Sequence, residues 1–416
     1  MIGGTDAAAF GCSGPPCSLR VKPANKACYS VLTNCEPAGL VAELSLGWRA
    51  ISLQLFAATI AVPMKLCAVH NGSSAMKHQP ISSPPPEPRS PRLGSAVQAL
   101  KDHAGWTAGV AAGAALLGAA LFNRAQARRA EAATPPAGQF IEVDGVRLHY
   151  VDRGEGSSTV VLLHGNGVTL QDYEASNVLG LAAARHRVIA FDRPGFGYSE
   201  RPRTTVWTPA RQAALILQAL KQLDVEQAVV VGHSWGTLVA LAMAAQDPAA
   251  LRGLVLLSGY YYGTARPDVV PMSAPAIPGL GDIMAHTVSP LAGRLMSPAA
   301  VKASFHPADV PTKFARFPIG LTLRPSQIRA TAADTAMMIP AAVELSQHYA
   351  QIAVPAIVMA GEGDLIAHKN KHSERLVTDI AGSELRIVPG QGHLFHYAVP
   401  EQVVAAIDDV LALSSA

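Results

Sequence analysis

The stretch VVVGHSWGTLVALAMAA, residues 229–245, decides the fold. Apolar residues lead into the sequence GHSWG at 232–236, and an apolar helical run follows. A G-x-S-x-G motif between a strand and a helix predicts a nucleophile elbow, in which the turn lifts the hydroxyl of Ser234 above the sheet. Gly232 and Gly236 let the strand and the helix approach closely. The motif also occurs by chance, but this strand-to-helix context favours the elbow.

The composition predicts a large apolar core with little affinity for nucleic acid. Of the 416 residues, 49% are hydrophobic and 15% are charged. Residues 1–138 hold 12 Lys and Arg against 6 Asp and Glu, whereas residues 139–416 hold 21 against 24. Because the second part has no basic surplus, we expect no nucleic-acid partner. All five cysteines precede residue 70, so residues 139–416 contain neither a disulfide nor a thiolate metal site.

Residues 1–99 are predicted to form a low-order extension, since they lack a regular apolar pattern and include a Pro/Ser-rich run at 76–91. We further expect translation to begin at Met64 or Met76. Residues 100–124 contain the uncharged run AGWTAGVAAGAALLGAALF. At 1.5 Å per residue this run is about 28 Å long, close to the thickness of a bilayer core. It predicts one transmembrane helix, followed by a linker at 125–138.

Two other interpretations of the apolar run stay open. The first is a buried Ala-rich helix of a soluble domain. The second is a cleaved signal peptide ending at Ala125-Gln126-Ala127, although Arg128 argues against cleavage there. We expect a single-pass protein of a bacterial inner membrane. Because basic residues flank both ends of the run, the side on which the catalytic domain lies is left open.

Residues 139–416 alternate buried strands with helices, which predicts an α/β fold with a doubly wound, mostly parallel sheet. Two strands joined at Asp144-Gly145 form the expected entry hairpin, with a type I′ turn. The segment at about 260–349 is rich in Pro, Gly and Met and lacks such strands. We interpret it as a helical cap inserted into the sheet domain.

Two later loops supply partners for the serine, which is a weak nucleophile without a base. Asp364 follows a buried strand in the sequence GEGD, and His393 follows the last strand in GQGH. Both loops are expected at the sheet edge that carries the elbow, in the order Ser, Asp, His. Asp364 would orient the imidazole of His393, which would take the proton of Ser234. Glu362 is a rival acid and His396 a rival base.

The site also needs donors for a developing oxyanion. The backbone N–H groups of Trp235 and Asn166 are the candidates, because one follows the nucleophile and the other lies in the loop after the LLHG strand. The sequence shows neither metal-ligand spacing nor a Gly-rich phosphate loop. We therefore predict no metal and no cofactor.

The motifs HGNG, DRPGFGYSERP, GHSWG, GEGD and GQGH, in this order, resemble the α/β-hydrolase superfamily. Within it they resemble the branch of bacterial esterases, carbon–carbon bond hydrolases, cofactor-free haloperoxidases and epoxide hydrolases. The resemblance covers residues 139–416. Ser234 stands where epoxide hydrolases and haloalkane dehalogenases carry Asp, which disfavours both. The resemblance implies a cap over the site, with Tyr260 and Tyr261 placed to contact substrate, although packing explains such tyrosines as well.

These observations predict a membrane-tethered serine hydrolase that cleaves small or medium apolar esters through an acyl-enzyme. One alternative is a carbon–carbon bond hydrolase, or a cofactor-free haloperoxidase or perhydrolase, on the same triad. Another is a non-catalytic ligand-binding module with a hydrolase-like fold. The expected partners are a small ester-like substrate and, through the N-terminal helix, a membrane. The identity of the substrate and the oligomeric state are left open.

Overall fold

The computed structural model describes residues 93–414, with side chains described from residue 106 onward. The predicted extension at 1–99 therefore lies almost wholly outside the described residues, and so do the five cysteines and the proposed translation starts. The described part belongs to one compact unit, residues 89–416.

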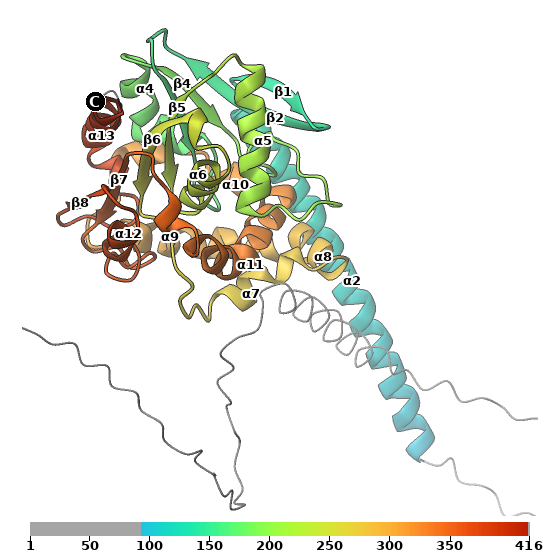
Figure 1. Ribbon diagram of the computed structural model, residues 1–416. Helices are drawn as coiled ribbons and strands as arrows, with labels where there is room; N and C mark the ends of the chain where they lie inside the picture. The colour runs from blue at the N-terminus through green and yellow to red at the C-terminus, as the bar shows by residue number, and fades with distance from the viewer. Residues whose placement is uncertain (1–92, 415–416) are drawn as a thin grey trace, which may run out of the picture. The chain divides into compact units, whose positions relative to one another are not determined.

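An eight-stranded sheet forms the centre of this unit (Figure 1), and its strand order is β1-β2-β4-β3-β5-β6-β7-β8. The antiparallel hairpin at one edge pairs with β4, and all later pairings are parallel. The predicted doubly wound sheet is confirmed. The strands are β1 (Gln139–Val143), β2 (Val146–Arg153), β3 (Thr159–Leu163), β4 (Arg187–Phe191), β5 (Ala228–His233), β6 (Leu251–Leu257), β7 (Ala356–Gly361) and β8 (Glu384–Val388).

Local sequence explains the boundaries of several elements. Asp144 and Gly145 both have positive φ, as a type I′ turn requires, so the predicted hairpin is confirmed. Thr208 caps α5 by accepting a hydrogen bond from the backbone N–H of Arg211. Two short helices follow β3, α3 (Gln171–Ser176) and α4 (Val178–Ala183), because Asn177 between them adopts a left-handed conformation that ends the first.

Helices cover both faces of the sheet, and the strands between them carry apolar side chains on each face. One layer of buried side chains joins the sheet to α5 and α6, and another joins it to α3, α4 and α13. The covering helices are α3 (Gln171–Ser176), α4 (Val178–Ala183), α5 (Pro209–Gln222), α6 (Trp235–Gln246), α12 (Ser373–Asp379) and α13 (Pro400–Leu413).

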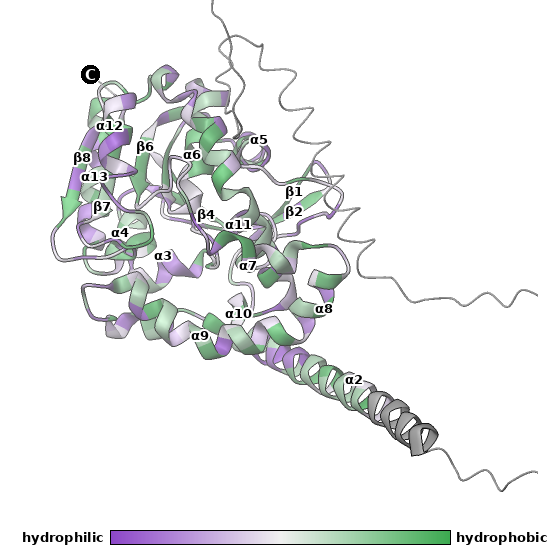
Figure 2. Ribbon diagram, turned by 90° about the horizontal axis from the view of Figure 1, so that it is seen from below, coloured by the Kyte–Doolittle hydropathy of each residue, from purple (hydrophilic) through white to green (hydrophobic). Residues whose placement is uncertain are grey.

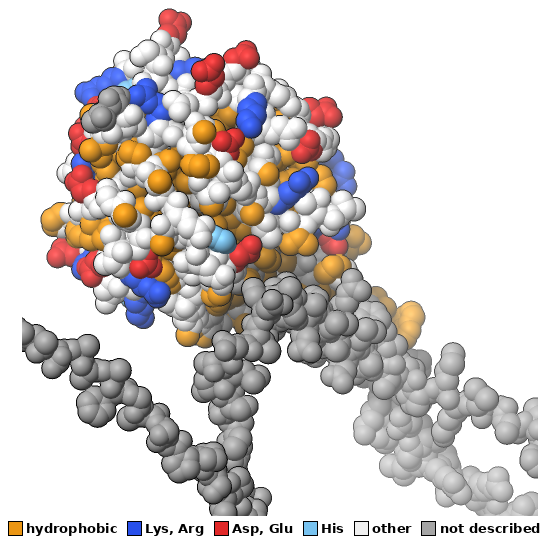
Figure 3. Space-filling view, in the orientation of Figure 1, with side chains coloured by type: hydrophobic (Ala, Val, Ile, Leu, Met, Phe, Trp, Pro, Cys, Tyr) orange, Lys and Arg blue, Asp and Glu red, His pale blue; other side chains and the backbone are white. Residues whose placement is uncertain are grey.

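A helical layer lies between β6 and β7 in the chain, in the segment where the sequence predicts a cap. We refer to it as the cap. Its α-helices are α7 (Val269–Ser273), α8 (Leu280–His286), α9 (Val288–Phe305), α10 (Ile319–Thr322) and α11 (Pro325–Ser346). Figure 3 shows hydrophobic side chains at the surface around α7 and α8.

The apolar run near residue 110 lies in α2, a helix that extends over Leu93–Ala133. Its part at Trp106–Ala133 is long and apolar enough to cross a membrane by length and composition, and 6% of its most apolar window is buried. The expected linker at 125–138 is helical as far as Ala133, which corrects the prediction. Ala, Arg, Gln and Glu are compatible with a helix there, proline first appears at Pro135, and contacts such as that of Glu131 with Arg324 hold the last turns of α2 against the cap.

Candidate active site

Ser234 occupies the sharp turn between β5 and α6. Its φ of 51° and ψ of −118° are strained for a residue with a side chain, which is the backbone signature of the elbow. A Cβ added at Gly236 would lie 2.2 Å from the carbonyl oxygen of Leu163, and one at Gly232 would lie 2.7 Å from the carbonyl oxygen of Gly236. Both positions therefore need glycine, and the partly exposed serine is held where strand, turn and helix meet.

Asp364 and His393 are in contact, as the sequence predicts. Nδ1 of His393 lies 2.8 Å from Oδ2 of Asp364, and both side chains are buried. The other carboxylate oxygen accepts hydrogen bonds from the backbone N–H groups of Ile366 and Ala367. Burial raises the pKa of Asp364, but the charge and hydrogen bond of His393 and these two N–H groups outweigh it, so the pKa lies well below its usual value. The carboxylate is thus ionised at neutral pH and fixes the proton of His393 on Nδ1.

The two rival residues have other partners. Nε2 of His396 lies 3.0 Å from Asp172 in a fully buried contact. Glu362 is exposed and accepts a hydrogen bond from the backbone N–H of Gly390. The geometry therefore favours Asp364 and His393 over Glu362 and His396 as the acid and base pair.

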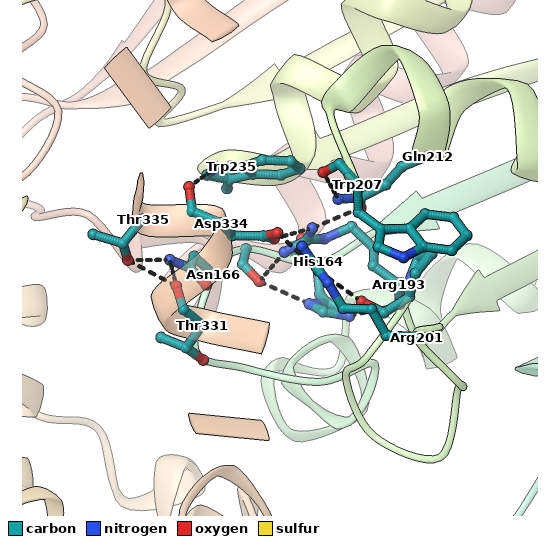
Figure 4. Close-up of polar contacts among 12 residues, drawn as sticks. His164, Asn166, Arg193, Arg201, Trp207, Gln212, Trp235, Thr331, Asp334 and Thr335 are labelled. Atoms are coloured by element: carbon teal, nitrogen blue, oxygen red, sulfur yellow. Dashed lines mark hydrogen bonds and ion pairs between the residues drawn. The ribbon is translucent and has the colours of Figure 1, made fainter. Parts of the chain in front are cut away.

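The loop after β3 approaches the serine closely. A Cβ added at Gly165 would lie 3.2 Å from Cβ of Ser234. The side-chain amide of the next residue, Asn166, donates to the carbonyl of Thr331 and to the hydroxyl of Thr335 on α11 (Figure 4). Trp235 is the first residue of α6, where backbone N–H groups lack partners within the helix. Both predicted oxyanion donors thus belong to segments next to Ser234.

Arg193 holds the loop after β3 in place, a role that the sequence did not suggest. Its fully buried guanidinium donates to the carbonyl oxygens of His164 and Gly165 at 2.8 and 3.0 Å. It also forms an ion pair of 2.7 Å with buried Asp334, which Arg201 contacts on the other side (Figure 4). Because Asp334 lies on α11, this ion pair connects the loop beside the elbow to the cap.

His164 is held neutral within the same group of contacts. Its Nε2 accepts a hydrogen bond from the backbone N–H of Arg193 at 3.0 Å, and its Nδ1 donates to the carbonyl of Gly165 at 2.8 Å. Burial and then the charge of Arg193 lower the pKa of His164 to about 4. The residue therefore shapes the loop as an uncharged imidazole.

A second buried group of polar side chains lies behind the elbow. Asp172 on α3 accepts hydrogen bonds from His396 and from the hydroxyl of Tyr397, at 3.0 and 2.9 Å. His233 lies 3.9 Å from the same carboxylate, and its Nε2 lies 3.2 Å from the carbonyl of His393. Burial holds the pKa of His233 well below its usual value. Because His233 is then neutral, Nε2–H donates to that carbonyl and ties the elbow to the loop of His393.

This second group also bears on metal binding. One donor atom from each of Asp172, His233 and His396 lies within 4.8 Å of the others, so the three could together hold a metal ion. The sequence spacing concealed them, because they come from three distant segments. Their mutual contacts already engage Asp172 and Nε2 of His396, which fits a hydrogen-bonded network equally well. The expectation that the chain needs no metal stays a prediction.

Tyr260 and Tyr261 leave the sheet where the sequence places them, and both are buried. The hydroxyl of Tyr260 donates to the carbonyl of Thr264, and its ring packs on His372. The backbone carbonyl of Tyr261 accepts a hydrogen bond from Tyr349. These contacts show packing within the protein, and contact with a substrate stays a prediction.

A cavity of about 910 Å³ opens between the loop after β4 and the cap. Its walls include Arg201, Arg203 and Arg329 and the exposed Ile277, whereas Ser234, Asp364 and His393 are not among its lining residues. The cavity therefore lies between the cap and the loop after β4, and it does not contain the three site residues.

Comparison with known proteins places this geometry in a family. A family model described as "alpha/beta hydrolase fold" matches residues 158–398. The 2-hydroxy-6-oxononadienedioate/2-hydroxy-6-oxononatrienedioate hydrolase of Paraburkholderia xenovorans is 29% identical over 68% of this chain and 96% of that enzyme. An uncharacterized hydrolase of Bacillus subtilis is 35% identical, over 31% of this chain and 47% of that protein. The chain thus spans less than half the length of that relative.

Solved structures share the fold. A thermophilic esterase from Thermogutta terrifontis superimposes with a TM-score of 0.55 at 21% identity, covering 67% of this chain and all of that chain. A membrane phospholipase A superimposes with a TM-score of 0.52 at 19% identity, covering 78% of this chain and 98% of that one. At such identities the likeness concerns the architecture alone.

Proposed function

We propose, since this chain belongs to the α/β-hydrolase family, that it is a serine hydrolase of small to medium apolar esters. Ser234 is the nucleophile, His393 the general base and Asp364 the carboxylate that orients it. The observation that carries the proposal is the contact of 2.8 Å between His393 and Asp364, on loops that follow strands of the sheet bearing the elbow.

The reaction follows from the proton positions. Because Nδ1–H of His393 donates to the ionised Asp364, Nε2 is left with a lone pair. Nε2 takes the proton of the Ser234 hydroxyl as its oxygen bonds to the ester carbonyl carbon. The tetrahedral adduct then expels the alcohol, which receives that proton from His393. Water, activated by the same imidazole, hydrolyses the acyl-enzyme and restores the serine.

The negative oxygen of the tetrahedral adduct needs fixed donors. We assign this role to the backbone N–H groups of Trp235 and Asn166. Trp235 is held by the start of α6, and its indole N–H donates to the carbonyl of Asp334 at 3.0 Å. Asn166 is held through its side chain by α11. Donors anchored in this way need no reorganisation as charge develops.

Replacement of the nucleophile tests the proposal. Ser234→Ala should lower the rate of short-chain nitrophenyl ester hydrolysis by about 10⁴-fold or more, and should abolish labelling by a fluorophosphonate probe. Ser346→Ala is the matched control, because that hydroxyl donates to the carbonyl of Val343 on its own helix, α11. Circular dichroism should be unchanged in both. Retained turnover or labelling in Ser234→Ala would exclude this nucleophile.

A second candidate substrate class rests on one observation, the relationship to the Paraburkholderia enzyme over nearly its whole length. In that case the same three residues would serve cleavage of a carbon–carbon bond in a vinylogous diketone. A direct comparison of kcat/KM for a dienedioate-type diketone and a nitrophenyl ester separates the two. A diketone value at least 100-fold above the ester value would replace the ester assignment.

A further inference from the structure

The cap carries apolar side chains that point into solvent along one face of two consecutive helices. Leu280 and Ile283 on α8 are both 57% exposed, and Leu295 on α9 is 83% exposed. Val288 and Leu291 are also exposed. The two residues on α8 are three positions apart, and the three on α9 are three and four positions apart, so they lie on one side of each helix. We call these five residues the cap apolar face. Of the 18 residues of α9, only Pro290 and Phe305 are buried.

The end of α2 packs against the junction between these two helices. The buried side-chain amide of Asn123 donates to the carbonyl oxygens of Thr287 and His286, at 2.6 and 3.1 Å. Its amide oxygen accepts a hydrogen bond from Arg294 at 2.9 Å, and Arg294 also lies over the ring of Phe122. Asn123 thus connects α2 to α8 and α9 at the border of the cap apolar face.

Further contacts toward the end of α2 fix its direction relative to the cap. Glu131 forms an ion pair of 3.1 Å with Arg324. Ala130 packs over Gly320 on α10, where an added Cβ would lie 3.1 Å from the alanine methyl group. The helix is therefore held near its end and again at Asn123, two turns earlier. Figure 2 shows it leaving the cap beside α8, α9 and α10.

Before Asn123 the same helix presents apolar side chains to solvent. Trp106, Leu117 and Leu121 are 60% exposed or more. After the apolar run at 108–122, the first polar positions are Asn123 and the exposed Arg124, which occur where the helix meets the cap. The apolar surface of α2 therefore ends beside the cap apolar face.

We propose that the cap apolar face docks on a lipid bilayer, at the boundary between headgroups and acyl chains, while the preceding part of α2 lies in the bilayer core. The contacts of Asn123 and Glu131 hold the two apolar surfaces side by side, so insertion of the helix brings the cap apolar face to the bilayer surface. Amphipathic helices bind this boundary through apolar side chains on one face. Arg124 and Arg128, next to the contact, suit the level of anionic headgroups.

Fluorescence in lipid nanodiscs tests this placement with the full-length chain. Its five cysteines are first replaced by serine. Single variants Ile283→Cys and Leu295→Cys then carry an environment-sensitive dye, and quenching by a lipid-attached nitroxide is compared with quenching by aqueous iodide. Leu117→Cys on α2 is the positive control. Leu413→Cys is the matched negative control, because Leu413 is 52% exposed at the end of α13, outside the cap.

The expected result is lipid quenching at positions 283 and 295 at least half as strong as at position 117, and at least fivefold stronger than at position 413. Iodide quenching at 283 and 295 should be correspondingly weak. Strong iodide quenching at both positions would overturn the proposal, because the face would then lie in water. Weak quenching by both agents would also overturn it, since a protein surface such as a second copy would then cover the face.

Discussion

The central sheet and the cap bury their apolar residues to very different degrees. All six residues of β5 and all six of β7 are buried, whereas α9 buries two of its 18 residues. Each central strand is covered by helices on both faces, so its own side chains specify its position. In the cap, α8 and α9 each leave an apolar face exposed. The positions of the central strands therefore follow from their own sequences, whereas the positions of the cap helices depend on the surfaces that they contact.

One buried ion pair joins the two regions, and breaking it should have the largest effect. Asp334→Ala leaves the guanidinium of Arg193 buried without its charge partner, which should lower the free energy of unfolding by about 3–5 kcal/mol. Asp282→Ala removes partly exposed ion pairs of the cap with Arg203 and Arg329 and should cost about 1 kcal/mol or less. Urea denaturation followed by circular dichroism measures both. Equal losses would show that the cap depends on its surface charges as much as on the buried pair.

A pair of leucine substitutions sharpens the same contrast. Leu162 in β3 is fully buried, so Leu162→Ala should lower the free energy of unfolding by about 2–5 kcal/mol through lost packing and a residual cavity. Leu295→Ala on α9 removes a side chain that is 83% exposed and should change it by about 0.5 kcal/mol or less in the absence of lipid. The measurement is again urea denaturation in lipid-free buffer. A loss above 2 kcal/mol at Leu295 would mean that another surface covers it in solution.

The smallest predicted effect is a pH dependence located at the sheet edge. The pKa of His164 is lowered to about 4, below the value of about 6.5 in the unfolded chain. The unfolded state therefore takes up this proton first as the pH falls. The stabilising contribution of neutral His164 is fully present above pH 6.5 and is lost as the pH falls toward 4. At about 1.4 kcal/mol per pH unit, roughly 1 kcal/mol is lost between pH 6.5 and 5.5.

Two histidine variants separate the contribution of His164 to the pH dependence of unfolding free energy from the contributions of other histidines. His164→Gln should flatten the fall of unfolding free energy between pH 6.5 and 5 relative to the unmodified protein. His286→Gln, at an exposed position in the cap, is the control variant. The absolute stability of His164→Gln is not the readout, because its contact with Arg193 is altered as well. If His164→Gln leaves the slope unchanged, the imidazole of His164 in the unmodified protein is already protonated in the folded state at those pH values.

The sequence predicted what depends on local patterns and missed what depends on distant partners. The GHSWG turn and the hairpin at Asp144-Gly145 follow from residues adjacent in the chain. The contact between Asp364 and His393 could be expected because parallel strands end at the same sheet edge. Their catalytic roles and those of the oxyanion donors stay predictions.

Other features could not be found in this way. Arg193 and Asp334 are separated by 141 positions, and Asp172 and His396 by 224, so nothing in either local sequence indicates the pairing. The extension of α2 through the expected linker was also missed. Its arginines and alanines suit a helix or a solvated linker, and contacts such as that of Glu131 with Arg324 come from the cap.

The attachment of α2 to the cap has a mechanical consequence. Asn123 and Glu131 attach this helix to the cap, whereas Ser234 belongs to the sheet domain. If the helix is embedded in lipid, the cap is the part that is fixed to the membrane. Any separation of the cap from the sheet domain would then move the sheet domain relative to the membrane. Bilayer thickness and helix tilt would therefore contribute to the free energy of substrate entry.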